Sequence, residues 1–153
     1  MEKARTDALS EALRLENQIC FPLYACAKEV VRQYRGPLEA LNLTYTQYIV
    51  MMVLWEYGDM TEGALGQIVR LDSGTLAPLL KRLERQGLIR RVRPEDDERR
   101  LILSLTEEGA ALRARAEAVP GQMRGCIDLA PEELLQLKAL LDKALAKMGR
   151  SRR

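Results

Sequence analysis

Apolar residues recur every three or four positions over most of the chain, a pattern that predicts a mainly helical protein. Four segments with this spacing lie in the first half of the chain, at residues 6–15, 17–34, 46–56 and 61–69. The second segment is expected to end at Gly36 and Pro37, because this pair interrupts a helix. A further helix is expected to begin near Gly74 or Thr75 and to end at Gly87, which suits a helix C-terminus. The helix at 61–69 and this further helix have the layout of a helix-turn-helix.

After Gly87 the hydrophobic pattern changes from helical to strand-like. Residues 88–93 and 100–105 are apolar runs of strand length, and the charged segment 94–99 separates them. This arrangement predicts a β-hairpin with a polar tip. The chain is therefore expected to have an α+β fold that is mainly α-helical, with a small β-hairpin wing.

Two more helices are expected after the hairpin. Thr106 is a capping residue for a helix that reaches about Val119, and Pro120 and Gly121 are expected to loosen or break it. A last helix is expected over residues 131–148. Its apolar stripe consists of Leu134, Leu137, Leu141, Leu145 and Met148. Such a stripe needs a partner surface, either in the same chain or in a second copy.

The helix that ends at Gly87 has one apolar face and one polar, basic face. The apolar stripe consists of Leu76, Leu79, Leu80 and Leu83. Pro78 lies on the other face and is expected to close the first helical turn, because a proline in a helix interior clashes with the carbonyl four residues earlier. Helix-turn-helix proteins contact DNA with an amino-terminal turn of this kind. The predicted DNA contacts are Ser73, Thr75, Pro78, Lys81, Arg82, Arg85, Arg93 and Arg99.

The basic residues are concentrated around this helix and the hairpin. The net charge of the chain is only +2, yet eight Lys and Arg residues lie between Lys81 and Arg100. Such a cluster is also compatible with an ordinary solvated surface. Arg99, at the hairpin tip, is placed to enter a minor groove, or else to pair with Asp97 and hold the tip in shape.

Composition disfavours most enzyme classes. The chain has no histidine, the commonest general base and metal ligand, and its three cysteines, spaced by 6 and 100 residues, match no zinc motif. We therefore expect no enzyme activity, no metal and no cofactor. We find neither an apolar run of about 20 residues nor a leader segment, so a cytoplasmic protein without a membrane partner is expected.

Three segments together resemble the MarR family of winged-helix regulators: residues 83–91, 97–99 and 105–109, which read LERQGLIRR, DER and LTEEG. The similarity extends over nearly the whole chain. It implies a homodimer held by its amino- and carboxy-terminal helices, with two recognition helices in successive major grooves of a near-palindromic double-stranded DNA operator. In such readers the half-sites lie ~34 Å apart.

Within that family, residues 15–21 (LENQICF) and 71–76 (LDSGTL) resemble the OhrR subgroup, which senses organic hydroperoxides. The resemblance implies that Cys20 is the oxidised residue. Pro22 belongs in a first helical turn, so Cys20 is expected at a helix N-terminus, where the dipole favours the thiolate that attacks a peroxide. The alternative is a buried, inert thiol.

The resemblance also assigns roles to Tyr34, Tyr45 and Cys126. The two tyrosines would hydrogen-bond the reactive cysteine, although each would serve equally as a core aromatic residue. Tyr34 lies 14 residues after Cys20, or ~21 Å along a helix, and could reach only the partner's Cys20. In the two-cysteine type of OhrR, Cys126 would resolve the sulfenic acid in a disulfide between subunits. Cys26 lies ~9 Å along the helix from Cys20 and is expected to pack.

These observations predict a redox-sensing repressor that binds its operator when reduced. Organic hydroperoxide would oxidise Cys20 to sulfenic acid, then a Cys20–Cys126 intersubunit disulfide would form and DNA would be released. The alternatives are a MarR-type repressor released by a non-covalent phenolic ligand and a thiol peroxidase. One domain is expected over 1–153, with a winged helix-turn-helix at 46–105, dimerisation helices at 6–36 and 106–148, and a disordered tail at 149–153.

Apolar side chains near the proposed sensor bear on the effector. Phe21, Leu23, Val30 and Met52 would suit a fatty-acyl or aromatic hydroperoxide better than hydrogen peroxide. Core packing explains the same side chains equally well, so this preference stays open.

Overall fold

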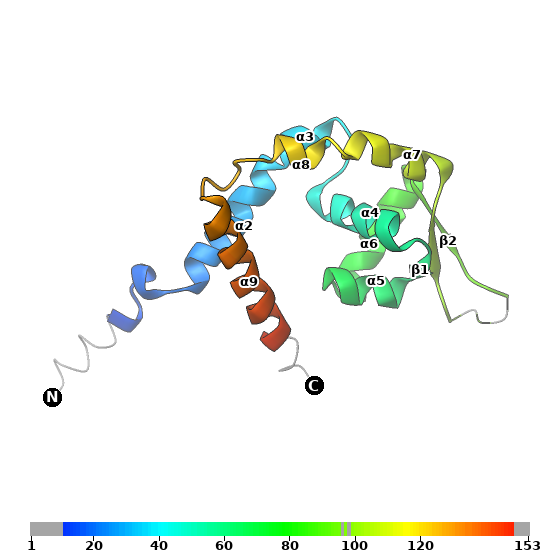
Figure 1. Ribbon diagram of the computed structural model, residues 1–153. Helices are drawn as coiled ribbons and strands as arrows, with labels where there is room; N and C mark the ends of the chain where they lie inside the picture. Colours follow the sequence, from blue (N-terminus) through cyan, green and yellow to red (C-terminus); the bar gives the residue numbers. More distant parts are fainter. Residues whose placement is uncertain (1–10, 96, 98, 149–153) are drawn as a thin grey trace. The chain divides into compact units, whose positions relative to one another are not determined.

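A computed structural model describes residues 11–95, 97 and 99–148 of the chain. The contacts divide the chain into two units, with the boundary between Met123 and Arg124. Residues 6–10 of the helix expected over 6–15, and the tail 149–153, lie outside the described residues. The elements are drawn in Figure 1.

The first unit contains helices and one small sheet. Its elements are η1 (Leu15–Asn17), α2 (Cys20–Gln33), α3 (Arg35–Glu39), α4 (Tyr45–Tyr57), β1 (Met60–Thr61), α5 (Glu62–Val69), α6 (Ser73–Arg85), β2 (Ile89–Val92), β3 (Ile102–Leu105), α7 (Glu107–Ala116) and α8 (Val119–Gln122). The second unit contains α9 (Pro131–Met148). The predicted mainly helical fold with a β-hairpin is confirmed.

The sheet is antiparallel, in the order β1-β3-β2. β2 and β3 form the predicted hairpin, in which Ile89 pairs with Leu105 and Val92 with Ile102. The two-residue strand β1 pairs with β3 through Met60 and Leu103, and the sequence analysis did not anticipate it. A strand this short has no recognisable period, so only its pairing defines it.

The core of the first unit lies between α4, α5, α6 and the sheet. Its most deeply buried side chains include Val50, Met51, Leu54, Leu65, Leu76, Leu80, Leu83, Ile89 and Leu103. Helix α7 joins this core closely: the Trp55 indole N–H donates to the Gly109 carbonyl at 2.8 Å. A Cβ at Gly109 would lie 1.9 Å from the Leu88 carbonyl oxygen, so only glycine permits this approach.

Capping residues lie at the ends of three helices, and two of them, Thr106 and Gly87, are as predicted. Thr106 accepts a hydrogen bond from the Gly109 N–H at the start of α7, and Gly87 adopts a φ of 73° just after α6. Thr44 starts α4 with a reciprocal capping box, in which its hydroxyl accepts from the Gln47 N–H and the Gln47 side chain accepts from the Thr44 N–H.

Of two expectations at prolines, one is wrong. Pro78 lies inside α6 rather than in its first turn, because Asp72 caps the helix and starts it at Ser73. The expected end of a helix just before Gly36 and Pro37 is confirmed, since α2 ends at Gln33, and the two residues lie in the first turn of a short helix, α3, that was not expected. A proline is tolerated there because the first N–H groups of a helix have no intrahelical acceptor.

The helix expected from Thr106 to Val119 is divided somewhat earlier. Helix α7 ends at Ala116, and Pro120 and Gly121 lie in the short helix α8. The last helix, α9, spans residues 131–148 as predicted. Among the described residues, no helix has the length and apolar character needed to span a membrane.

Candidate functional site

The amino terminus of α6 is built around Asp72. Its carboxylate accepts from the Thr75 backbone N–H at 2.9 Å and from the Thr75 hydroxyl at 3.1 Å. These hydrogen bonds, the backbone one first, lower the pKa of Asp72 below its ordinary value. Asp72 therefore holds the Thr75 hydroxyl in a fixed orientation at the exposed start of the helix.

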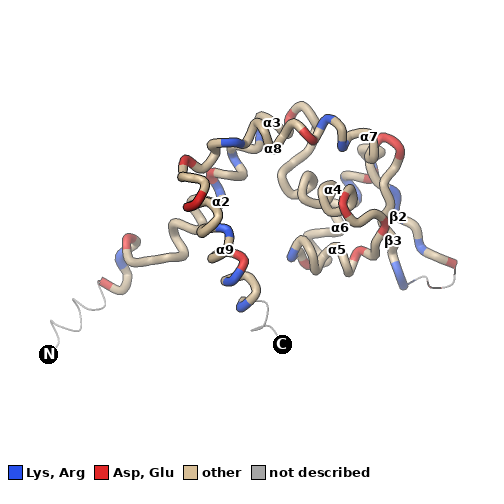
Figure 2. The backbone as a smooth tube through the Cα atoms, in the orientation of Figure 1, with Lys and Arg blue, Asp and Glu red and all other residues tan. Residues whose placement is uncertain are grey.

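The predicted DNA-contact residues of α6 lie on its exposed face. Ser73, Thr75, Pro78, Lys81, Arg82 and Arg85 are all exposed. The four leucines predicted on the opposite face, Leu76, Leu79, Leu80 and Leu83, are all buried. This amphipathic division presents hydroxyls and cations to a ligand outside the chain. Figure 2 marks the charged residues along the backbone, with Lys and Arg on the hairpin as well as on α6.

The hairpin tip is shaped by Asp97. The Asp97 carboxylate accepts from the Arg99 backbone N–H at 3.1 Å, and the Asp97 carbonyl accepts from the Arg100 N–H at 3.0 Å. Asp97 thus shapes the tip through the backbone of Arg99, whereas the predicted pairing of the two residues and the predicted minor-groove contact of Arg99 both stay predictions. Arg99 and Arg93 are both exposed.

An ion pair that the sequence analysis missed joins α6 to the wing. The Arg91 guanidinium donates to the Glu84 carboxylate, with nitrogen–oxygen distances of 2.8 and 2.9 Å. The Arg91 side chain is only 20% exposed. Because the pair connects the helix to strand β2, it fixes the wing relative to the helix face that carries the predicted DNA contacts.

Cys20 is the first residue of the 14-residue helix α2 and is exposed. Its position at the N-terminus is as predicted, and the thiol is not buried within this chain. Tyr24 and Lys28 follow Cys20 at four-residue intervals on the same helix face, and the Lys28 ammonium lies 5.2 Å from the centre of the Tyr24 ring. Neither residue was anticipated, although this spacing was the signal that could have shown them.

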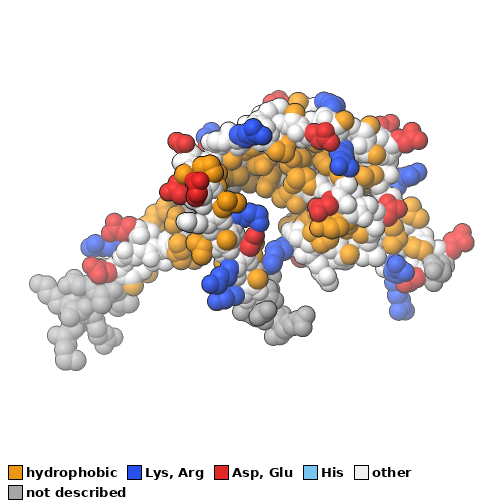
Figure 3. Space-filling model, viewed as in Figure 1, with side chains coloured by type: hydrophobic (Ala, Val, Ile, Leu, Met, Phe, Trp, Pro, Cys, Tyr) orange, Lys and Arg blue, Asp and Glu red, His pale blue; other side chains and the backbone are white. Residues whose placement is uncertain are grey.

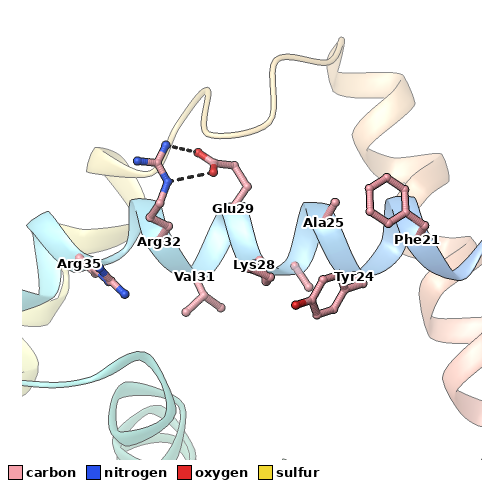
Figure 4. Close-up of a pocket in the computed structure, with 9 residues that line it drawn as sticks. Phe21, Tyr24, Ala25, Lys28, Glu29, Val31, Arg32 and Arg35 are labelled. Atoms are coloured by element: carbon pink, nitrogen blue, oxygen red, sulfur yellow. Dashed lines mark hydrogen bonds and ion pairs between the residues drawn. The ribbon is translucent and has the colours of Figure 1, made fainter. Parts of the chain in front are cut away.

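Helix α2 carries an open groove along its surface, shown in Figure 4. Tyr24 and Val31 point to one side of the helix, and the ion pair between Glu29 and Arg32 stands on the other. The Arg32 hydrogen bond and charge lower the pKa of Glu29. No residue of α2, which the structure describes throughout, is buried.

Tyr34 and Tyr45 lie together, with ring centres 4.6 Å apart and the rings tilted by 42°. Both are half-buried and line a hollow with Val31, Leu38 and other residues at the α3–α4 junction. Tyr34 follows the last residue of α2, so it lies at the opposite end of that helix from Cys20 of the same chain. Burial and the nearby Tyr45 raise the pKa of Tyr48. The centres of the Tyr48 and Tyr34 rings lie 6.0 Å apart.

The other two cysteines differ in setting. Cys26 is exposed on α2, so the packing predicted for it is not made within this chain. Cys126 is half-buried in the segment that precedes α9 in the second unit. No disulfide joins these three described thiols. Within the described residues, no group of three or more His, Cys, Asp or Glu side chains is placed to hold a metal ion.

Comparisons with known proteins agree with this geometry. The sequence profile described as "Transcriptional regulator SarA/Rot" matches residues 33–115, more than half of the 153 residues. The chain belongs to this family of MarR-like winged-helix regulators. The predicted MarR resemblance is thus confirmed, and the chain is a transcriptional regulator rather than an enzyme, which decides against the thiol peroxidase alternative.

Individual relatives of this regulator extend the comparison. The organic hydroperoxide resistance transcriptional regulator of Bacillus subtilis (strain 168) is 48% identical over 129 residues, covering 84% of this chain and 88% of that protein. Reduced AbfR bound to DNA has a TM-score of 0.74 and 34% identity, covering 93% of this chain and 99% of that one. Disulfide-formed AbfR has a TM-score of 0.62 and 34% identity, covering 92% and 98%. AbfR comes from Staphylococcus epidermidis.

Proposed function

We propose that this regulator is a redox-sensing repressor that binds a near-palindromic operator when reduced and leaves it after an organic hydroperoxide oxidises Cys20. The supporting observation is the exposed position of Cys20 at the start of α2, in a chain 48% identical to an organic hydroperoxide resistance regulator. The DNA-bound form of AbfR supports double-stranded DNA as the partner.

The proposed chemistry has two steps. The Cys20 thiolate attacks the terminal oxygen of the hydroperoxide, an S–O bond forms and the O–O bond breaks, and the alkoxide leaves as an alcohol after taking up a proton. The Cys126 thiolate then attacks the sulfenic sulfur, an S–S bond forms, and the hydroxyl leaves as water with a proton. The attacking sulfur belongs to the first residue of α2, at the positive end of the helix dipole. Tyr34 and Tyr45 of one subunit would donate hydrogen bonds to the partner's Cys20.

Exposed apolar surface supports the proposed homodimer. None of the side chains of α2 or α9, two fully described helices, is buried, although Tyr24 and Leu135 are large and apolar. Figure 3 shows hydrophobic side chains on the visible surface of these helices. We therefore propose that segments 6–36 and 106–148 form the dimer and that segment 46–105 contacts DNA.

Release of DNA would follow from a change in the spacing of the two recognition helices. Two recognition helices contact successive major grooves only at a spacing of about 34 Å. A covalent Cys20–Cys126 bond between subunits would alter the arrangement of the dimer helices, and with it that spacing. The wing residues Arg93 and Arg99 would then no longer align with their DNA contacts, and neither would α6.

The decisive experiment measures binding to an operator selected by the reduced protein from a random duplex library, before and after addition of cumene hydroperoxide. Wild type is expected to release DNA and to form a reducible covalent dimer on non-reducing gels. Cys20→Ser should stay bound, and Cys126→Ser should form sulfenic acid without the dimer band. Cys26→Ser, an exposed thiol on the same helix, is the matched control and should behave as wild type.

Two outcomes would overturn the proposal. Release of the Cys20→Ser protein by the hydroperoxide would remove Cys20 from the sensing step. Release of that variant by a phenolic ligand such as salicylate, with no response of wild type to hydroperoxide, would instead identify a non-covalent MarR-type switch.

A further inference from the structure

Gln47 is the one buried polar side chain among the described residues, only 4% exposed. It lies in the first turn of α4, two residues after Tyr45. Its carbonyl oxygen accepts from the Thr44 N–H at 2.8 Å, and its amide nitrogen donates to the side-chain oxygen of Gln86 at 3.2 Å. Burial of a polar group is unfavourable unless it is hydrogen-bonded, so the exact placement of Gln47 depends on Gln86.

Gln86 continues the same chain of hydrogen bonds. It is the residue that follows α6, and its amide nitrogen donates to the Asn42 carbonyl at 2.8 Å. Asn42 lies just before α4, with a φ of 53° that non-glycine residues rarely adopt. The side chains of Gln47 and Gln86 therefore tie the carboxy end of α6 to the amino end of α4. We refer to this pair as the glutamine bridge.

The glutamine bridge helps to set the orientation of α6 on the core. The α6 face that packs on the core consists of leucines, and their packing sets the angle of the helix only to within about 15–20°. The directional contacts at the end of α6 include the bridge to α4, the Glu84–Arg91 pair to the wing and the hydrogen bond that the Thr106 hydroxyl donates to the Gly87 carbonyl. The bridge is the one that leads toward Tyr45, the first residue of α4, which stacks on Tyr34.

We propose that the glutamine bridge passes the redox state to the recognition helix: it is intact in the reduced, DNA-binding form and broken after oxidation of Cys20. The inference rests on the proposed function, in which the partner's Cys20 acts at Tyr34 and Tyr45. A change at Tyr45 moves the first turn of α4, which carries both the Thr44 cap and Gln47. The hydrogen bond to Gln86 is then lost, and α6 loses its fixed angle. Gln47 and Gln86 are thus positioning residues that need not touch DNA.

The test replaces each glutamine by methionine, which has similar size and no amide, in the full-length dimer. Gln86→Met, Gln47→Met and the double variant are compared with Gln122→Met, an exposed glutamine on α8. The dissociation constant for the selected operator is measured for reduced and for cumene hydroperoxide-treated protein. Rates of sulfenic acid formation at Cys20, trapped with dimedone, are measured in parallel.

Each single variant should bind DNA about fivefold more weakly when reduced, equivalent to about 1 kcal/mol. The double variant should bind DNA no more weakly than each single variant, because the same bridge is lost in all three proteins. The oxidised forms should bind as oxidised wild type does, so the affinity ratio between the two states falls about fivefold. The dependence of affinity on salt should keep its slope, since no phosphate contact is removed.

Several results would overturn the inference. An equal loss in both redox states would make the bridge purely structural, and a lower salt slope for Gln86→Met would make Gln86 a phosphate contact. Losses that multiply in the double variant would show that the two glutamines act separately. Gln86 is exposed, so its variant keeps the test valid even if Gln47→Met folds poorly. Failure of wild type to respond to hydroperoxide would instead refute the proposed function.

Discussion

The winged-helix part of the chain, α4 to β3, and the terminal helices, α2 and α9, use apolar residues in opposite ways. In the winged-helix part, side chains such as Leu80 and Leu83 are fully buried within the chain. In the terminal helices, Leu135 and Leu140 are 70% and 64% exposed. The first region satisfies its hydrophobic pattern internally, whereas the second leaves large apolar side chains exposed within the described chain. A helical stripe in a sequence therefore predicts burial without saying which molecule provides it.

Truncation in the core should have the largest effect on folding. Leu80→Ala removes a side chain with 0% exposure and should lower the free energy of unfolding by about 2–5 kcal/mol. The same truncation at Leu135, on α9, should change it by less than about 0.5 kcal/mol at protein concentrations where the chain is monomeric, because any loss at this position falls on assembly. Chemical denaturation of both variants measures the difference. Equal losses at the two positions would contradict the contrast between the regions.

A charge on the apolar stripe of α9 should act on assembly rather than on folding. Leu141→Glu is expected to raise the dimer dissociation constant at least about a hundredfold, or about 2.8 kcal/mol, because an unpaired carboxylate enters an apolar interface. Sedimentation at decreasing protein concentration measures this constant. Lys143→Glu, a charge change on the same helix outside the predicted stripe, serves as the control. An unchanged dimer in the Leu141 variant would exclude this face from the interface.

Two glycines sharpen the contrast between tight and open packing. Gly109→Ala forces a Cβ against the Leu88 carbonyl and should destabilise the fold by about 1–3 kcal/mol. Gly121→Ala meets no atom within 4 Å and should be neutral or slightly stabilising. The melting temperatures of the two variants measure this difference in stability. Tolerance of alanine at position 109 would show that α7 does not pack this closely on the hairpin.

The smallest expected effect concerns acid stability at the α6 cap. The Thr75 hydrogen bonds lower the pKa of Asp72 in the folded chain, so their stabilisation is complete above the unfolded value of about 3.9. It is lost as the pH falls through the lower, folded pKa. Asp72→Asn keeps the acceptor and should flatten this part of the pH profile. Melting temperatures of both proteins from about pH 6 to about pH 2 measure the change; identical profiles would contradict it.

Much of the fold could be predicted because it depends on local spacing. The leucine stripe of α6, the Thr106 cap, the positive φ of Gly87 and the position of Cys20 at a helix start each follow from residues within about one or two turns of one another. The position of Pro78 was wrong because the Asp72 cap set the start of α6 earlier than the proline suggested. The roles of Cys20, Cys126, Tyr34 and Tyr45 stay predictions, since they involve a second subunit.

The sequence by itself determined the order of the elements, the two faces of α6 and the position of Cys20 at a helix start, because periodicity, capping and helix ends are short-range properties. Only the tertiary structure decided that β1 pairs with β3, that Glu84 holds Arg91 and that Gln47 meets Gln86, 39 residues away. No local pattern selects one distant partner among many polar residues. That selection is made when the leucines of α6 pack on the core and bring the polar ends of α4 and α6 within hydrogen-bonding distance.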